Sequence, residues 1–140
     1  MTNEERWRAY VLAYDVEVSQ EDVEEELYRV RADMKHRMIY AQMSGGELHP
    51  FPEMELAEQT DALMEAAVFE VKEPLVLKEL AAKVDVTVTK EELLAEAEAI
   101  AAREGSTLDM LRRFFGEDFS LLERDVRERK IRDWAVGQQG

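Results

Sequence analysis

The apolar residues between Gln20 and Met43 recur at intervals of three and four positions, which is the spacing of one face of an α-helix. The pattern predicts a helix of about 24 residues with one narrow apolar stripe. Because most of its remaining surface is charged, we expect this helix to pack on one side only. The run Ser44-Gly45-Gly46 predicts its end. The stripe consists of Val23, Leu27, Val30, Met34, Met38 and Ala41.

Two further helical patterns flank this one. A first helix is predicted over Asn3 to Tyr14, with aromatic and aliphatic side chains on one face. The segment Glu47 to Pro52 contains two prolines, which exclude regular helix. A second long pattern then runs from Glu53 to Lys83. Pro74 lies inside it and is expected to kink the helix rather than split it near Lys72, because the apolar pattern resumes at once.

One short pattern occurs twice in the chain. Tyr14 to Leu27 reads YDVEVSQEDVEEEL, and Val84 to Glu98 reads VDVTVTKEELLAEAE. In each copy a brief extended piece leads to a hydroxyl side chain, Ser19 or Thr89, with an acidic residue three positions later. This arrangement is typical of a helix N-cap, and Thr89 with Glu92 matches a full capping box. Since the two halves of the chain cease to match after Val30 and Ile100, the copies predict two similar helix starts and do not indicate a duplicated domain.

The C-terminal part predicts three shorter helices. The helix that begins after Thr89 is expected to reach about Arg103 and to stop at Gly105. Ser106 and Thr107 are predicted to cap a short helix, LDMLRRFF, closed by Gly116. Asp118 or Ser120 is expected to cap a last helix that fades at Gly137. No alternation of strands and helices occurs along the chain, so the predicted fold class is all-α and multi-helical.

Charge and composition narrow the possible partners. The net charge of −14 argues against nucleic acid, whose phosphates are bound by Lys and Arg. Residues 112–132 are mildly positive, with seven basic and five acidic side chains. They either form an internal docking face or reflect the preference for basic residues late in helices. No apolar run is long enough to span a membrane, and the first residues, MTNEERWRAY, do not resemble a signal peptide, so we expect a cytoplasmic protein.

The chain offers little for catalysis. It has no cysteine, which excludes disulfides, thiol catalysis and cysteine-ligated zinc. His36 and His49 have no His or Cys neighbours at metal-ligand spacing. Carboxylates are abundant but occupy capping or solvated positions, whereas acid/base work needs a shielded pocket. No glycine-rich phosphate loop follows a strand. We therefore predict no enzyme activity, no catalytic residue, no metal and no cofactor.

The candidate binding residues are methionines and phenylalanines. Methionine is flexible and polarisable, so a surface rich in it adapts to varied apolar partners. A stripe at helical spacing is more often core, which is our interpretation of Leu27 and Val30. The sequence leaves the exposure of the residues beside the predicted hairpin tip open, although a tip has little to bury them against. The neighbours Phe114 and Phe115 cannot face the same way on one helix. The full candidate set is Met34, Met38, Met43, Phe51, Met54, Phe114 and Phe115.

Several ordered motifs carry a family resemblance. The run from Val84, VDVTVTKEELLAEAEAIAAREGSTLDMLRRFFGEDFSLLERDVRERKIRDWAVG, resembles the C-terminal part of trigger factor, the ribosome-associated bacterial chaperone. The preceding VFEVKEPLVLKELAAK and the earlier YDVEVSQEDVEEELYRV are similar to further parts of that family, so the resemblance covers most of residues 7–136. It implies an α-helical substrate-binding domain with two long protruding arms that hold unfolded chains without ATP. The family's ribosome-binding and prolyl isomerase domains have no counterpart, and the loop MSGGELHPFPE differs from the family's usual tip.

Two functional hypotheses follow. The first is an ATP-independent holdase: one helical chaperone domain over residues 1–140, with an arm-like hairpin over about 20–83 and a body over about 3–14 and 84–136. It would bind apolar segments of unfolded or nascent polypeptides through the candidate set, and its acidic arms would favour basic clients. The second is a helical adaptor or self-association module, with one defined partner or a homodimer. The identity of the clients, the oligomeric state, the arm geometry around Pro74, and whether the chain is an excised domain or a naturally short protein stay open.

Overall fold

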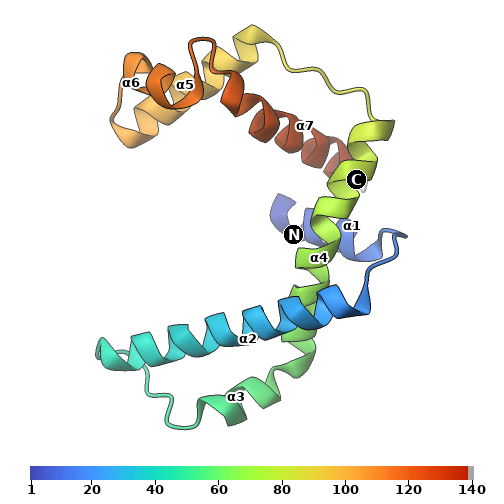
Figure 1. Cartoon of the computed structure of the whole chain (residues 1–140), viewed down its shortest axis with the longest axis vertical. Coiled ribbons are helices and arrows are strands. Elements are labelled where there is room, and N and C mark those ends of the chain that lie inside the picture. The colour runs from blue at the N-terminus through green and yellow to red at the C-terminus, as the bar shows by residue number, and fades with distance from the viewer. Residues whose placement is uncertain (139–140) are drawn as a thin grey trace. The chain divides into compact units, whose positions relative to one another are not determined.

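The structure is a computed structural model that describes residues 1–138, and over that range it contains helices and no strand (Figure 1). This confirms the predicted all-α class. The last two residues of the domain predicted over 1–140 lie outside the described part. In chain order the elements are α1 (Asn3–Ala13), α2 (Gln20–Met43), α3 (Pro52–Glu58), α4 (Thr60–Lys83), α5 (Lys90–Glu104), α6 (Leu108–Phe115), the short 3₁₀ helix η1 (Ser120–Leu122) and α7 (Glu123–Gln138).

The repeated sequence pattern starts two helices in the same way. Ser19 has extended backbone, and its side chain accepts a hydrogen bond from the backbone N–H of Asp22 at 3.3 Å. Thr89 accepts from the backbone N–H of Glu92 at 3.1 Å, and Glu92 Oε1 accepts from the backbone N–H of Thr89 at 3.2 Å. The capping box at α5 is therefore confirmed, and α2 has the simpler cap. Thr107 caps α6 through the backbone N–H of Met110.

The ends of α5 and α6 also follow the sequence pattern. Gly105 closes α5 in the left-handed conformation with φ of 64°, and Gly116 closes α6 with φ of 96° and ψ of 161°. The prediction for the last helix is only partly right. Asp118 Oδ1 accepts from the backbone N–H of Ser120 at 3.1 Å, so it stabilises the start of η1, and α7 begins three residues later at Glu123.

The long pattern from Glu53 to Lys83 forms two helices, so the prediction of one helix is wrong. The break lies at Gln59, between α3 and α4. Thr60 Oγ1 donates to the carbonyl of Ala57 at 2.8 Å, and this side-chain bond takes up a carbonyl at the end of α3. The expected absence of a split near Lys72 is confirmed, because α4 continues through Pro74 although proline offers no N–H to the turn before it.

The chain divides into two compact units. The first comprises Met1–Trp7 and the chain from Leu77 onward, and the second comprises Arg8–Val76. In the second unit α2 and α3 lie side by side and form a hairpin (Figure 1). Its core contains Met38, Leu56 and Leu63, with Leu27, Val30 and Met34 packed against them. The division into an arm-like hairpin and a body, as drawn from the sequence, stays a prediction.

The core of the first unit joins α5, α6, η1 and α7. Its buried residues are Leu93, Ala97, Leu111, Phe119, Leu122 and Val126. Ion pairs fix α7 on α5: Arg129 lies 2.7 Å from a carboxylate oxygen of Glu96, and Lys130 lies 2.8 Å from Glu92. α7 carries no basic residue in its last turn. Arg112 and Arg113 lie in the last turn of α6, whereas Arg129 and Lys130 pair with α5, so each of the two explanations for the positive segment 112–132 applies to part of it.

Candidate functional site

The loop between α2 and α3 is tied to both helices of the hairpin. The backbone N–H of His49 donates to the side-chain oxygen of Gln42 on α2 at 2.8 Å. The Nδ1 atom of His49 lies 3.0 Å from both carboxylate oxygens of Glu55 on α3. The backbone N–H of Gly46 donates to the carbonyl of Ala41 at 2.8 Å. These contacts hold the loop in one conformation at the end of the hairpin.

Large apolar side chains at this end of the hairpin are exposed to water. Met43 is 82% exposed, Phe51 66% and Met54 65%. The sequence left their exposure open, and the structure places all three on the surface. Two further large side chains accompany them, at 74% and 72% exposure. We call this set the tip surface: Tyr40, Met43, Leu48, Phe51 and Met54.

Met34 and Met38 do not belong to the tip surface. Met38 is buried with 7% of its surface exposed, and Met34 is half-buried against the same core. Both lie in the apolar stripe of α2 that also carries Leu27 and Val30, and α3 and α4 cover that stripe. Met38 is therefore a core residue, and neither methionine presents an open apolar surface to a partner.

Phe114 and Phe115 face different ways, as expected for neighbours on one helix. Phe115 is half-buried and packs against the core of the first unit. Phe114 is 67% exposed, and Met110, one turn earlier on α6, is 43% exposed. α6 thus presents an apolar pair of its own. The tip surface belongs to the other compact unit, so the structure gives two separate exposed apolar surfaces.

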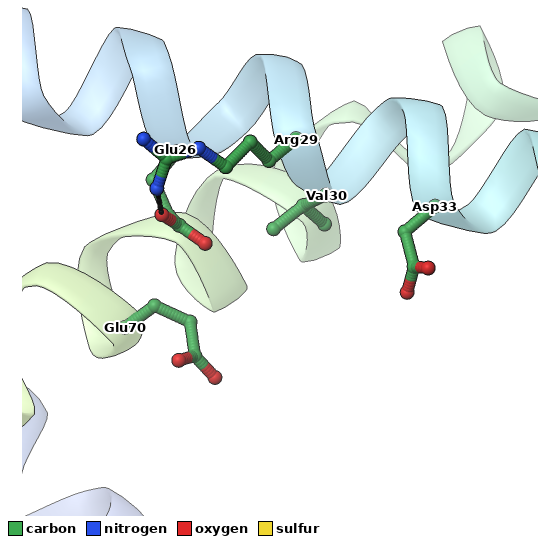
Figure 2. Close-up of a pocket in the computed structure, with 5 residues that line it drawn as sticks. All are labelled: Glu26, Arg29, Val30, Asp33 and Glu70. Atoms are coloured by element: carbon green, nitrogen blue, oxygen red, sulfur yellow. Dashed lines mark hydrogen bonds and ion pairs between the residues drawn. The ribbon is translucent and has the colours of Figure 1, made fainter.

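The hairpin is strongly acidic around the tip surface. Residues 38–71 contain seven Asp and Glu residues and no Lys or Arg. A groove of about 400 Å³, lined by residues of α2 and α4, also contains more acidic than basic side chains (Figure 2). Figure 2 shows one guanidinium, of Arg29, which pairs with Glu26 at 3.0 Å, and two further carboxylates beside Val30. The groove is lined by Glu26, Arg29, Val30, Asp33 and Glu70.

Tyr40 and Leu48 are surface residues that the candidate set omitted. Leu48 lies in the loop whose prolines exclude helix, so no helical stripe could bury it, and this is a signal present in the sequence. Tyr40 lies three residues before Met43, on a similar side of α2. Neither signal establishes exposure alone, because exposure depends on where α3 packs.

Among residues 1–138, no group of three His, Asp or Glu side chains is arranged to hold a metal ion. No helix in that range is long and apolar enough to cross a membrane.

An all-α chain that leaves large apolar side chains exposed at the end of a helical hairpin has the features of a helical protein-binding domain. Comparison with family models identifies the family to which this domain belongs. The model of the bacterial trigger factor protein C-terminus matches residues 3–137, and the chain therefore belongs to that family. The family implies a function of the chaperone type, and the matching model describes its C-terminal part and not the isomerase domain. No curated protein and no solved structure matches this chain.

Proposed function

We propose that this chain is an ATP-independent holdase domain that binds exposed apolar segments of unfolded or nascent polypeptides. The observation that carries this proposal is the exposure of Met43, Phe51 and Met54 at a loop that is fixed against both helices of the hairpin. A surface of this kind costs free energy in water unless a partner covers it. Membership of the trigger factor family supports a polypeptide as that partner.

Binding at the tip surface works through reversible burial of apolar area. Full burial of a Met or Phe side chain contributes about 1.5–3 kcal/mol, and association itself costs about 4 kcal/mol or more. A few such side chains therefore give weak and reversible binding. Weak contacts exchange rapidly, which lets a client leave and fold without nucleotide hydrolysis. Met43 and Met54 suit varied clients because methionine repacks easily.

The charge of the hairpin supports a preference for clients that carry basic residues near apolar ones. Residues 38–71 have no basic side chain apart from His49. In the groove of Figure 2, Glu26 pairs with Arg29 and Asp33 pairs with Arg37, and Glu70 adds a further carboxylate. A client lysine or arginine lowers the electrostatic energy there, whereas an acidic side chain raises it.

The exposed pair on α6 provides a second contact surface in this proposal. Phe114 and Met110 lie four residues apart, so both occupy one side of the helix. A client segment at this pair buries apolar area in the same way as a segment at the tip surface.

The proposal is tested by light scattering from several unrelated proteins that refold from denaturant. The full chain is added at stoichiometric amounts, next to a tip variant with Met43→Ser, Phe51→Ser and Met54→Ser. Leu121→Ser is the matched control, because Leu121 is 68% exposed and lies outside the proposed surfaces. We expect the wild-type chain and the control to suppress aggregation and the tip variant to lose most of this effect. Protection of none of the proteins overturns the proposal.

The same preparation separates the holdase from the adaptor or self-association module. Sedimentation of the full chain over a range of concentrations reports whether copies associate. A dimer that the three tip substitutions abolish, without protection of any client, favours self-association. A homodimer and a cytoplasmic localisation both stay predictions, and membership of the trigger factor family supports the second.

A further inference from the structure

A second groove of about 320 Å³ on the hairpin differs in charge from the rest of its unit. Its α2 residues occupy positions 28, 31, 32 and 35, which share one helix face. Leu56 of α3, only 1% exposed, contributes an apolar floor, and Tyr28 is 77% exposed at the rim. The lining residues are Tyr28, Arg31, Ala32, Lys35, Glu53 and Leu56.

Two cations and one carboxylate border this groove. Lys35 Nζ lies 2.6 Å from Glu53 Oε1, so that pair is satisfied. Arg31 lies one turn before Lys35 on the same face. Within the described chain Arg31 has no ion-pair partner, and its helical neighbours three and four positions away carry no acid: they are Leu27, Tyr28, Met34 and Lys35.

Arg31 and Glu53 line the same groove, so the charge of Arg31 acts on that carboxylate. The hydrogen bond and the charge of Lys35 lower the pKa of Glu53, and the charge of Arg31 lowers it further. The groove therefore has a surplus of one positive charge, in a chain whose net charge is −14. This local reversal distinguishes it from the acidic groove of Figure 2 on the same helix.

We propose that this groove binds a client segment in which an Asp or Glu side chain stands next to an apolar one. The apolar side chain lies against Ala32 and the ring of Tyr28, and the carboxylate pairs with the guanidinium of Arg31. Arginine suits this role because its planar guanidinium donates two parallel hydrogen bonds to one carboxylate. The inference rests on the proposed holdase function and adds a second class of client segment to it.

The charge of the surroundings makes Arg31 the favoured contact for such a segment. Outside this groove an acidic side chain meets the six other carboxylates of residues 38–71. A basic client side chain in this groove meets Arg31 and Lys35 instead. Client segments of opposite charge are thereby directed to different grooves of one hairpin, so that clients of mixed charge are held at two points.

Fluorescence anisotropy on the full chain tests the inference with two labelled peptides. They are identical unfolded sequences with one Leu-Asp step in the first and Leu-Asn in the second. We expect the Asp peptide to bind about three- to fivefold more tightly to the wild-type chain at low salt, as for an exposed ion pair. Arg31→Gln should bring this ratio to about one. Arg103→Gln is the matched control and should leave the ratio unchanged, since Arg103 lies on α5, outside the proposed grooves, and already pairs with Glu104.

The outcomes separate this inference from the proposed function. Equal affinity of the wild-type chain for the two peptides overturns it, and so does a preference that survives Arg31→Gln. The tip variant addresses the holdase proposal on its own, because it leaves Arg31 in place. If the tip variant loses binding to both peptides while no Asp preference exists in the wild-type chain, only the charged groove is refuted.

Discussion

The side-chain Nζ of Lys72 donates a hydrogen bond to the backbone carbonyl of Tyr14 at 2.6 Å. It donates a second bond to the carbonyl of Leu12 at 2.9 Å. Lys72 is 8% exposed, and α1 carries no basic residue in its own last turn. A lysine of α4 therefore caps the C-terminus of α1, where free carbonyls and the helix dipole favour a positive charge.

Replacing this lysine should destabilise the fold markedly. Lys72→Met keeps most of the apolar stem and removes the ammonium, so the carbonyl of Leu12 loses its Lys72 donor and that of Tyr14 keeps only the bond from the backbone N–H of Val16 at 3.1 Å. We expect a loss of about 2 kcal/mol in the free energy of unfolding, measured by urea titration. Lys78→Met, at an exposed position of the same helix, is the control and should change stability by less than about 0.5 kcal/mol. Equal effects of the two substitutions would contradict the capping role.

The two copies of the repeated pattern should differ in their contribution to stability. Thr89→Ala removes one half of a reciprocal capping box, and we expect it to cost about 1 kcal/mol. Ser19→Ala removes a single bond of 3.3 Å and should cost about half as much. Thr87→Ala, two residues before the cap, serves as the control. Thermal or urea unfolding measures both losses of stability. A larger loss for Ser19→Ala than for Thr89→Ala would contradict this order.

Glu92 should make the protein more sensitive to acid. The hydrogen bond from Lys130, followed by the bond from the backbone N–H of Thr89, holds the pKa of Glu92 below its ordinary value of 4.5. A carboxyl whose pKa is lower in the folded chain stabilises the fold above its unfolded pKa. That contribution is lost as the pH falls through the folded pKa.

We therefore expect the free energy of unfolding to decrease when the pH is lowered from neutral to below 4.5. Glu92→Gln should be less stable at neutral pH and show a shallower decrease on acidification. Glu91→Gln, on the neighbouring exposed carboxylate, is the matched control. A Glu92→Gln variant with the wild-type pH dependence would show that the ion pair with Lys130 does not contribute.

Gly116 should tolerate no side chain, in contrast to Gly137. Gly116 has φ of 96°, and a Cβ atom there would lie 3.2 Å from Ser120 Oγ. Gly116→Ala should therefore cost about 1–3 kcal/mol. Gly137 lies in α7 with open space around its position, so Gly137→Ala should not reduce stability. Differential scanning calorimetry compares the melting temperatures of the two variants and the wild-type chain. An unchanged melting temperature for Gly116→Ala would refute the requirement for glycine.

Much of the fold follows from local signals in the sequence. The starts of α2, α5 and α6 coincide with the hydroxyl caps, and Gly105 and Gly116 end two helices as expected. The break at Gln59 was not predicted, because the apolar spacing continues across it. Thr60 gives no sign of a break in the sequence, and its role is visible only in the hydrogen bond from its hydroxyl to the carbonyl of Ala57. The capping of α1 by Lys72 depends on a contact between residues nearly 60 positions apart, which no local pattern reports.

The candidate site was predictable only in part, because exposure is a tertiary property. Met34 and Met38 share the stripe of Leu27 and Val30, and the same stripe that predicts the helix also predicts their burial. Met43 lies past the point where α3 and α4 cover α2, and the sequence does not show where that cover ends. Arg31 was not identified from the sequence, since its significance depends on Glu53 and Leu56 from α3.

The central claim is that the tip surface holds unfolded chains, and one binding measurement tests it most directly. An unfolded protein that is reduced and carboxymethylated, so that it cannot refold, is titrated with the full chain and followed by fluorescence anisotropy. We expect the variant with Met43→Ser, Phe51→Ser and Met54→Ser to bind about tenfold more weakly or worse than the wild-type chain. Leu121→Ser should bind like the wild-type chain. Equal dissociation constants for the tip variant and the wild-type chain would contradict the claim.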